Sequence, residues 1–205
     1  MSIHFDRRFL GVLFLLVMGI TSAAAQPGSQ TTPQTHDEYV QAGREAATKA
    51  DYKTAAAWYS KAIAVRPDNY DVLYGRAGVY TLLQKYDLAL KDLDTIVKAL
   101  PTSIPALYLR GSVYNIKKDY KKAIQDGDAI LKLNPNSGQG YQVRGGAYAG
   151  QKKYKEAEED LTTAIRLDPA NHVNYIYRGA VYEEQGMAGK SQADKLKAEQ
   201  LKPGQ

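Results

Sequence analysis

The chain contains no cysteine. It therefore has no disulfide framework, no thiolate ligand for a metal, and no cysteine that could carry a lipid. Its three histidines, His4, His36 and His172, lie far apart in the sequence, and this spacing matches neither a metal motif nor a catalytic triad. We interpret each histidine as a solvated or turn residue, and we expect no catalytic residue, no metal ion and no cofactor.

Two other marks of an enzyme are also lacking. The recurring Arg-Gly pairs do not follow a predicted strand, so they do not resemble a phosphate-binding loop. The acidic pairs Glu158–Glu159 and Glu183–Glu184 are adjacent in the sequence, and neighbouring residues of a helix point in different directions. These pairs therefore do not form an acid/base couple, and the sequence predicts a protein that is not an enzyme.

Long hydrophobic runs are absent too. The longest apolar run, Phe9 to Ile20, has twelve residues and would span about 18 Å as a helix, less than the roughly 30 Å of a bilayer core. A short basic start, MSIHFDRR, precedes the run, and the small residues TSAAA follow it. This order is typical of a secretory signal peptide over residues 1–25, cleaved after Ala25. A retained membrane anchor is the weaker alternative.

The predicted leader places the protein outside the cytoplasm. Arg7 and Arg8 also allow twin-arginine export, but the general secretory route fits the rest of the leader better. Residues 26–35, QPGSQTTPQT, are expected to be a flexible lead-in. We expect a periplasmic protein of a bacterium, with secretion as the alternative and no stable membrane insertion after cleavage.

Charge gives little support for nucleic-acid binding. The net charge is +5, and removing the two arginines and one aspartate of the leader leaves +4. Nucleic-acid binding needs a continuous basic stripe beside exposed aromatic side chains, whereas most tyrosines here occupy positions expected to pack inside. The lysines are interpreted as a solvated face.

The few prolines are informative because five of the eight are regularly spaced. They stand 34 residues apart, at Pro67, Pro101, Pro135, Pro169 and Pro203. This period divides the chain into five windows, which are residues 36–69, 70–103, 104–137, 138–171 and 172–205. A period of 34 is typical of a helix–turn–helix repeat that buries its apolar face only by stacking on its neighbours.

Aligning the windows shows small and large residues at fixed positions, counted from the first residue of each window. Position 8 is always small, with Gly43, Ala77, Gly111, Gly145 and Gly179. Position 20 is small as well, with Ala55, Ala89, Ala123, Ala157 and Ser191. Position 17 is tyrosine in four windows, and spacings of three, four and seven mark one face of a helix. Each window is predicted to hold two helices that approach closely at positions 8 and 20.

Stretches such as ALYLRGSVYNIKKDYKKAI and GYQVRGGAYAGQKKYKEAEEDLTTAIRLDPAN resemble the tetratricopeptide repeat family over about residues 36–203. The resemblance implies an all-α fold, a right-handed α-solenoid of about five tandem repeats with a concave groove. It also implies a non-catalytic scaffold or adaptor that binds a protein or peptide segment in that groove. The alternatives are a self-associating structural protein, since a homo-oligomer is possible, or an obligate non-catalytic subunit of an envelope assembly.

Two positions change together within the chain. Position 7 is arginine and position 23 is aspartate in windows two to five, whereas window one has Ala42 and Trp58. The two positions should lie on the same side of an antiparallel helix pair, and the planar guanidinium suits a carboxylate. We predict structural salt bridges in the pairs Arg76–Asp92, Arg110–Asp126, Arg144–Asp160 and Arg178–Asp194.

The resemblance also implies which residues face the groove. By analogy with the family, the expected contacts to a partner are Tyr74, Tyr108, Asn115, Gln142 and Ile176. The positions that bind a C-terminal carboxylate in some members of the family are mostly neutral and small here, which disfavours a receptor for chaperone tails. The alternative is that the tyrosines only shield the surface.

Two positions in the second helices depart from the pattern. Gly127 stands where the family has a large residue, and we interpret it as a packing defect, with a local bend or space for a neighbour as alternatives. Lys195 occupies the same position in the last window. It is expected to belong to a solubilising C-terminal cap.

Overall fold

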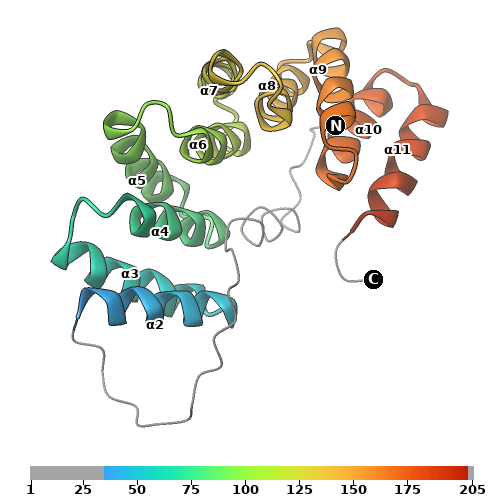
Figure 1. Ribbon diagram of the computed structural model, residues 1–205. Coiled ribbons are helices and arrows are strands. Elements are labelled where there is room, and N and C mark those ends of the chain that lie inside the picture. Colours follow the sequence, from blue (N-terminus) through green and yellow to red (C-terminus); the bar gives the residue numbers. More distant parts are fainter. Residues whose placement is uncertain (1–34, 203–205) are drawn as a thin grey trace. The chain divides into compact units, whose positions relative to one another are not determined.

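The computed structural model describes residues 35–202. Within this range the chain forms ten α-helices and no β-strand (Figure 1), which confirms the predicted all-α class. The predicted signal peptide and nearly all of the predicted lead-in lie outside the described residues.

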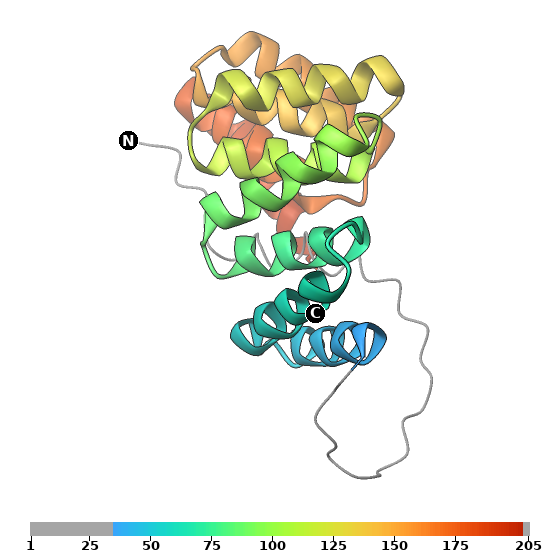
Figure 2. The ribbon, with the colours of Figure 1, turned by 90° about the vertical axis from the view of Figure 1, so that its left-hand side faces the viewer.

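Each window holds one helix pair, and the two helices of a pair run antiparallel, as Figure 2 shows from a second side. The first helices of the pairs are α2 (His36–Thr48), α4 (Tyr70–Leu82), α6 (Ile104–Ile116), α8 (Gly138–Gly150) and α10 (His172–Glu184). The second helices are α3 (Tyr52–Val65), α5 (Tyr86–Ala99), α7 (Tyr120–Leu133), α9 (Tyr154–Leu167) and α11 (Ala188–Gln200).

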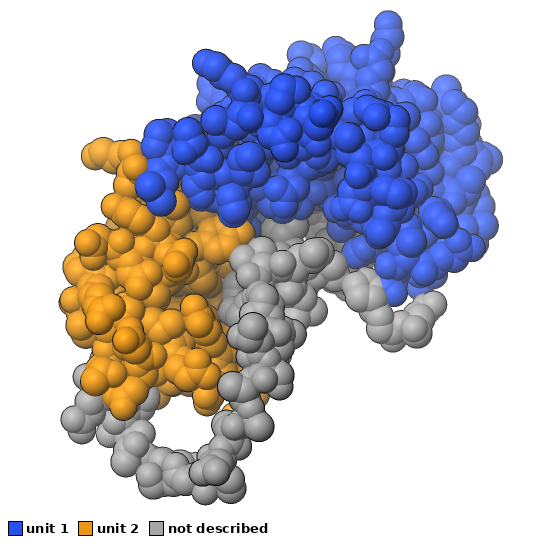
Figure 3. All heavy atoms as spheres, in the orientation of Figure 1, with its two compact units in different colours: residues 1–5, 100–205 blue, residues 6–99 orange. Residues whose placement is uncertain are grey.

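The helices belong to two compact units, which Figure 3 colours separately. The unit that ends at Ala99 contains α2 to α5, and the unit that begins at Leu100 contains α6 to α11. Within each unit, successive helices pack against one another along the chain. Each unit therefore builds its core from neighbouring repeats.

Short polar side chains begin many of the helices. Thr35 accepts a hydrogen bond from the backbone N–H of Glu38, whose carboxylate accepts one from the N–H of Thr35, so the two form a capping box at α2. Asn69 caps α4 and Asp119 caps α7 in the same way, each accepting from the third residue after it. These caps satisfy amide donors that a helix start leaves without intrahelical partners.

The first helix of each pair ends in the same tight turn. The residue at position 15 has a positive φ in every window: Ala50, Gln84, Lys118, Lys152 and Gly186. The next residue donates its N–H to a carbonyl five residues earlier, as from Asp119 to Tyr114 and from Lys153 to Tyr148. This geometry is the Schellman turn, and it sends the chain into the antiparallel second helix.

The small positions allow the two helices of a pair to approach closely. A Cβ atom on Gly145 would lie 2.9 Å from Cγ of Leu161 and 3.1 Å from Cβ of Asp160, and Ala157 on the facing helix is fully buried. Gly43 has the same relation to the ring of Tyr59. Small residues at positions 8 and 20 are therefore needed because neighbouring large side chains already fill the space.

The interpretation of Gly127 as a packing defect is wrong. A Cβ atom there would lie 2.9 Å from Cβ of Arg144, and 3.2 Å from both the backbone N of Arg144 and the carbonyl oxygen of Gly140. Two of these three atoms belong to the backbone of α8, so they cannot move aside as a flexible side chain would. Glycine is used here to bring α7 close to α8.

Candidate functional site

The structure brings together the four predicted arginine–aspartate pairs. Each pair has two hydrogen bonds, because Nε and Nη2 of the arginine each donate to a separate carboxylate oxygen. The donor–acceptor distances lie between 2.6 Å for Arg110 Nη2 to Asp126 Oδ1 and 3.0 Å for Arg110 Nε to Asp126 Oδ2. All four aspartates are buried, so each pair joins the two helices of one repeat from inside.

A second partner of these arginines was not expected from the sequence. Nη1 of Arg144 donates to Asp128 at 2.8 Å, and Nη1 of Arg178 donates to Thr162 at 3.1 Å. In the other unit, Nη1 of Arg76 donates to Ser60 at 2.9 Å. Ser60, Asp128 and Thr162 all stand at position 25 of the preceding window, so one guanidinium joins its own repeat to the repeat before it.

The surroundings of the arginines fit a structural role. Hydrogen bonding by Asp160 raises the pKa of Arg144, against the opposing effect of burial, and Asp128 adds to the rise. Aromatic rings lie beside the guanidinium groups, with Arg76 5.5 Å from the ring centre of Tyr80 and Arg178 5.6 Å from that of Tyr182. Carboxylates and hydroxyls of the protein itself occupy these arginines, which leaves them poorly suited to bind an external anion.

The first helices of the unit that begins at Leu100 form a continuous surface, because α8 packs beside both α6 and α10. We call this the first-helix surface. The hydroxyl of Tyr108 on α6 donates to Oε1 of Gln142 on α8 at 2.6 Å, and Nδ2 of Asn115 donates to the carbonyl of Val143 at 2.8 Å. Three of the expected contact residues thus tie α6 to α8. All three are buried.

Two amide oxygens of this unit are buried without a hydrogen-bond partner among residues 35–202. They are Oδ1 of Asn115, in a side chain 2% exposed, and Oδ1 of Asn174, in a side chain 1% exposed. Gly146 on α8 lies between Asn115 and Tyr177, since a Cβ there would be 3.3 Å from the former and 3.4 Å from the ring of the latter. Buried acceptors of this kind require an explanation, because an unmet one costs about 1–3 kcal/mol.

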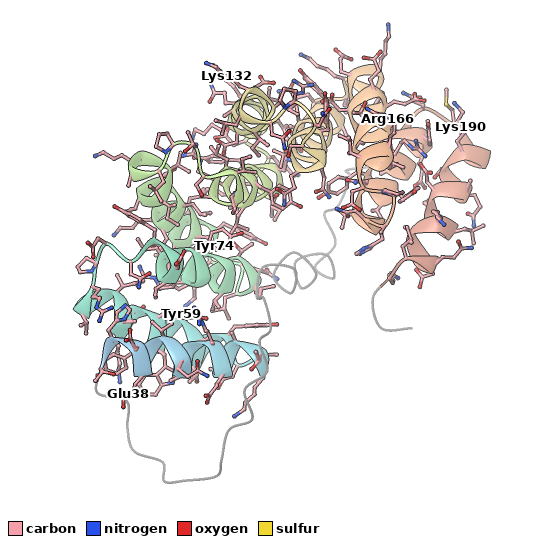
Figure 4. The ribbon with its side chains drawn as sticks, in the orientation of Figure 1. Glu38, Tyr59, Tyr74, Lys132, Arg166 and Lys190 are labelled. Atoms are coloured by element: carbon pink, nitrogen blue, oxygen red, sulfur yellow. The ribbon has the colours of Figure 1, made fainter. Side chains whose placement is uncertain are left out.

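The two remaining expected contacts lie in different units. Tyr74 on α4 is partly buried, and burial raises the pKa of its hydroxyl to about 12 (Figure 4). Ile176 on α10 is also partly buried. Contact of any of the five residues with a partner stays a prediction.

The interpretation of His36 and His172 as solvated residues is wrong. Each is the first residue of its helix and each is 5% exposed. Nε2 of His36 lies 3.2 Å from Nδ2 of Asn69, the residue that caps the next first helix. Burial lowers the pKa of His172, and the positive charge of Lys202 lowers it further. Recurrence of histidine at position 1 of two windows was the sequence signal for this packing role.

Residues 35–202 include no cluster of three or more histidine or acidic side chains that could hold a metal ion. No helix in this part of the chain is long and apolar enough to cross a membrane.

Comparison with known proteins gives one consistent relationship. Profiles described as tetratricopeptide repeat match residues 40–104, 104–137 and 138–171. Heat shock protein STI1 of Saccharomyces cerevisiae (strain ATCC 204508 / S288c) is 42% identical over 69 residues. The match covers 33% of this chain but only 12% of that protein.

Solved structures agree on the fold. A tetratricopeptide repeat protein from Parabacteroides merdae ATCC 43184 gives a TM-score of 0.75 at 25% identity, with 85% of this chain and 68% of that chain covered. A thermophilic tetratricopeptide repeat protein from Thermus thermophilus gives 0.72 at 18% identity, covering 82% and 92%. MamA from Desulfovibrio magneticus RS-1 gives 0.69 at 19% identity, covering 83% and 97%.

The helix pairs have the tetratricopeptide solenoid fold, a fold that suggests a scaffold for protein–protein interaction. With profile matches that together extend from residue 40 to residue 171, the chain belongs to the tetratricopeptide repeat family.

Proposed function

We propose that this protein is a non-catalytic scaffold of the bacterial cell envelope that binds a peptide or protein segment on its first helices. Family membership supports binding of a protein, and the leader-like start of the sequence supports the envelope location. The family is a general interaction module, so the partner has to be argued from the surface itself.

The observation that supports peptide binding is the continuous surface of the first helices α6, α8 and α10, since α8 packs beside both α6 and α10. The expected contact Ile176 belongs to α10 and is only partly buried, so a bound segment can reach it. The unpartnered oxygens of Asn115 and Asn174 are enclosed by the protein and lie out of reach of a partner.

Site-specific photo-crosslinking in cells tests this surface directly. A photoreactive phenylalanine analogue would replace Ile176, a partly buried residue of the first helix α10. Matched controls carry it at Lys132 and Arg166, residues of the second helices α7 and α9 (Figure 4). We expect a discrete crosslinked partner from the first-helix position only. Equal crosslinking from the control positions, or none from any position, would contradict the proposal.

The envelope location needs its own test. The full chain with a C-terminal tag would be expressed in a Gram-negative bacterium, and the periplasmic fraction would be analysed by mass spectrometry of the N-terminal peptide. We expect a periplasmic product that begins at Gln26. A protein that keeps Met1 and stays with the cytoplasmic fraction would refute the location but leave the binding surface untouched.

A further inference from the structure

The junction between consecutive repeats has a fixed chemistry. The arginine at position 7 reaches back to a hydrogen-bond acceptor at position 25 of the preceding repeat, as in Arg144 to Asp128 and Arg178 to Thr162. The same arginine holds the aspartate at position 23 of its own repeat. Residues at positions 7, 23 and 25 therefore form the polar contact within a repeat and between consecutive repeats.

Both ends of the array depart from this chemistry at these three positions. In the first repeat, position 7 is Ala42 and position 23 is Trp58. In the last repeat, position 25 is Leu196, which is 56% exposed. The arginine, its aspartate and its acceptor are thus replaced by three apolar residues, two at one end of the array and one at the other.

The first repeat presents an aromatic group where the ion pair stands elsewhere. The rings of Tyr39 and Trp58 are stacked, with centres 5.9 Å apart, and Nζ of Lys61 lies 4.3 Å from the ring centre of Trp58. Ala42 and Trp58 are both partly exposed. The methyl group of Ala42 is much shorter than the arginine side chain that reaches the preceding repeat elsewhere.

We propose that the α10–α11 end of one copy of this protein stacks on the α2–α3 end of a second copy, in the register of the internal repeats. In that register Leu196 takes the place of the position-25 acceptor and packs over Ala42 beside Trp58. An apolar side chain then meets an apolar site, because the first repeat has alanine and tryptophan where the other repeats have the arginine–aspartate pair.

Charge supports the same register. At the internal junction between α7 and α8, position 24 contacts position 3 of the next repeat, because a Cβ on Gly127 would lie 3.2 Å from the carbonyl of Gly140. Position 24 of the last repeat is Lys195, and position 3 of the first repeat is Glu38; both are exposed. Stacking two copies therefore places opposite charges near each other at the rim of the apolar contact.

This contact joins the α10–α11 end of one copy to the α2–α3 end of another, so a pair of copies still has one unused end of each kind. The association is heterologous and adds copies one after another. The inference does not rest on the proposed peptide binding, so its failure would leave that proposal intact.

The test uses the full chain expressed in bacteria, purified, and studied by sedimentation velocity over a range of concentrations. The unaltered protein should associate as its concentration rises. Leu196→Lys should weaken association about 10- to 100-fold, because it removes the apolar side chain and places a charge at the contact. The control Leu133→Lys alters an exposed leucine of an internal repeat and should associate as the unaltered protein does.

A mixing experiment distinguishes stacking from any symmetric contact. Ala42→Arg blocks the α2–α3 end, and arginine occurs naturally at this position in the other four repeats. At a concentration where the unaltered protein is mostly associated, each variant alone should be mostly monomeric. Leu196→Lys mixed with Ala42→Arg has one intact pair of surfaces and should give a one-to-one dimer. Circular dichroism checks that both variants fold. A monomeric unaltered protein, association of either variant alone as strong as that of the unaltered protein, or no dimer in the mixture would overturn the proposal.

Discussion

Gly127 determines how closely two consecutive repeats approach. Its α-hydrogen faces the backbone of α8, where an added Cβ would lie 2.9 Å from Cβ of Arg144. Gly127→Ala should therefore lower the free energy of unfolding by about 1–3 kcal/mol, although alanine is the better helix former. Denaturant unfolding of both proteins measures the difference.

Gly189 provides the matched control, because nothing lies within 4 Å of the Cβ that alanine would add there. It belongs to α11, so Gly189→Ala should raise stability by about 0.5 kcal/mol through helix propensity alone. Equal effects of the two substitutions would show that the approach of α7 to α8 does not depend on glycine.

His172 makes stability depend on pH. Burial lowers the pKa of its imidazole below the ordinary value of 6.5, so the folded protein favours the neutral ring more than the unfolded chain does. This contribution is complete above pH 6.5 and is lost as pH falls through the lowered folded-state pKa. Between about pH 7.5 and about pH 5, the melting temperature of the unaltered protein should therefore fall more than that of His172→Gln. Parallel curves would contradict this account.

The repetition of the sequence made many residue contacts predictable, because each window serves as a comparison for the others. Arginine and aspartate change together between windows, and that joint change indicated the pairs seen at Arg144–Asp160 and its equivalents. The second partner at position 25 was missed because serine, aspartate and threonine share only the ability to accept a hydrogen bond. A position whose residues share a hydrogen-bonding ability but not their identity is harder to recognise in an alignment of only five windows.

At the scale of the helix, α11 has one main neighbour and few buried side chains. Its buried residues are Ser191, Asp194 and Ala198, and it packs mainly on α10. Arg178 holds Asp194 through two hydrogen bonds of 2.8 Å. This ion pair links α10 to α11 through a buried carboxylate.

Arg178→Gln should loosen α11 selectively. The substitution leaves the buried carboxylate of Asp194 without its cation, which is strongly unfavourable, so amides of α11 should exchange with solvent about tenfold or more faster. Amides of α6 and α7 should be unchanged, since stability in repeat arrays is set mainly between neighbours. Hydrogen exchange followed by mass spectrometry resolves the helices.

The exposed pair Lys195–Glu183 supplies the control for this experiment. Its two side chains are about half exposed, and exposed ion pairs contribute about 0–1 kcal/mol. Lys195→Gln should therefore change exchange in α11 only slightly. A uniform acceleration across residues 100–202 by Arg178→Gln would show that the unit opens as a whole instead.

At the scale of the whole molecule, the period of 34 residues predicted the all-α solenoid class, because a repeating unit that cannot bury its own apolar face must stack. The surface for a partner was less predictable. Tyr108 and Gln142 were expected as contacts from family positions, yet they bond to each other across α6 and α8. Side chains of this length can bond between helices or to a ligand, and the sequence pattern is the same in both cases.

Stacking of copies has a consequence for stability, because binding that occurs only between folded chains favours the folded state. The end helix α11 and the apolar residue Leu196 would be covered in the stack, so the melting temperature should rise with protein concentration. In Leu196→Lys it should be independent of concentration, and in Leu133→Lys it should rise as in the unaltered protein. Scanning calorimetry over a hundredfold range of concentration measures this, and a concentration-independent melting temperature of the unaltered protein would mean that the two ends do not meet.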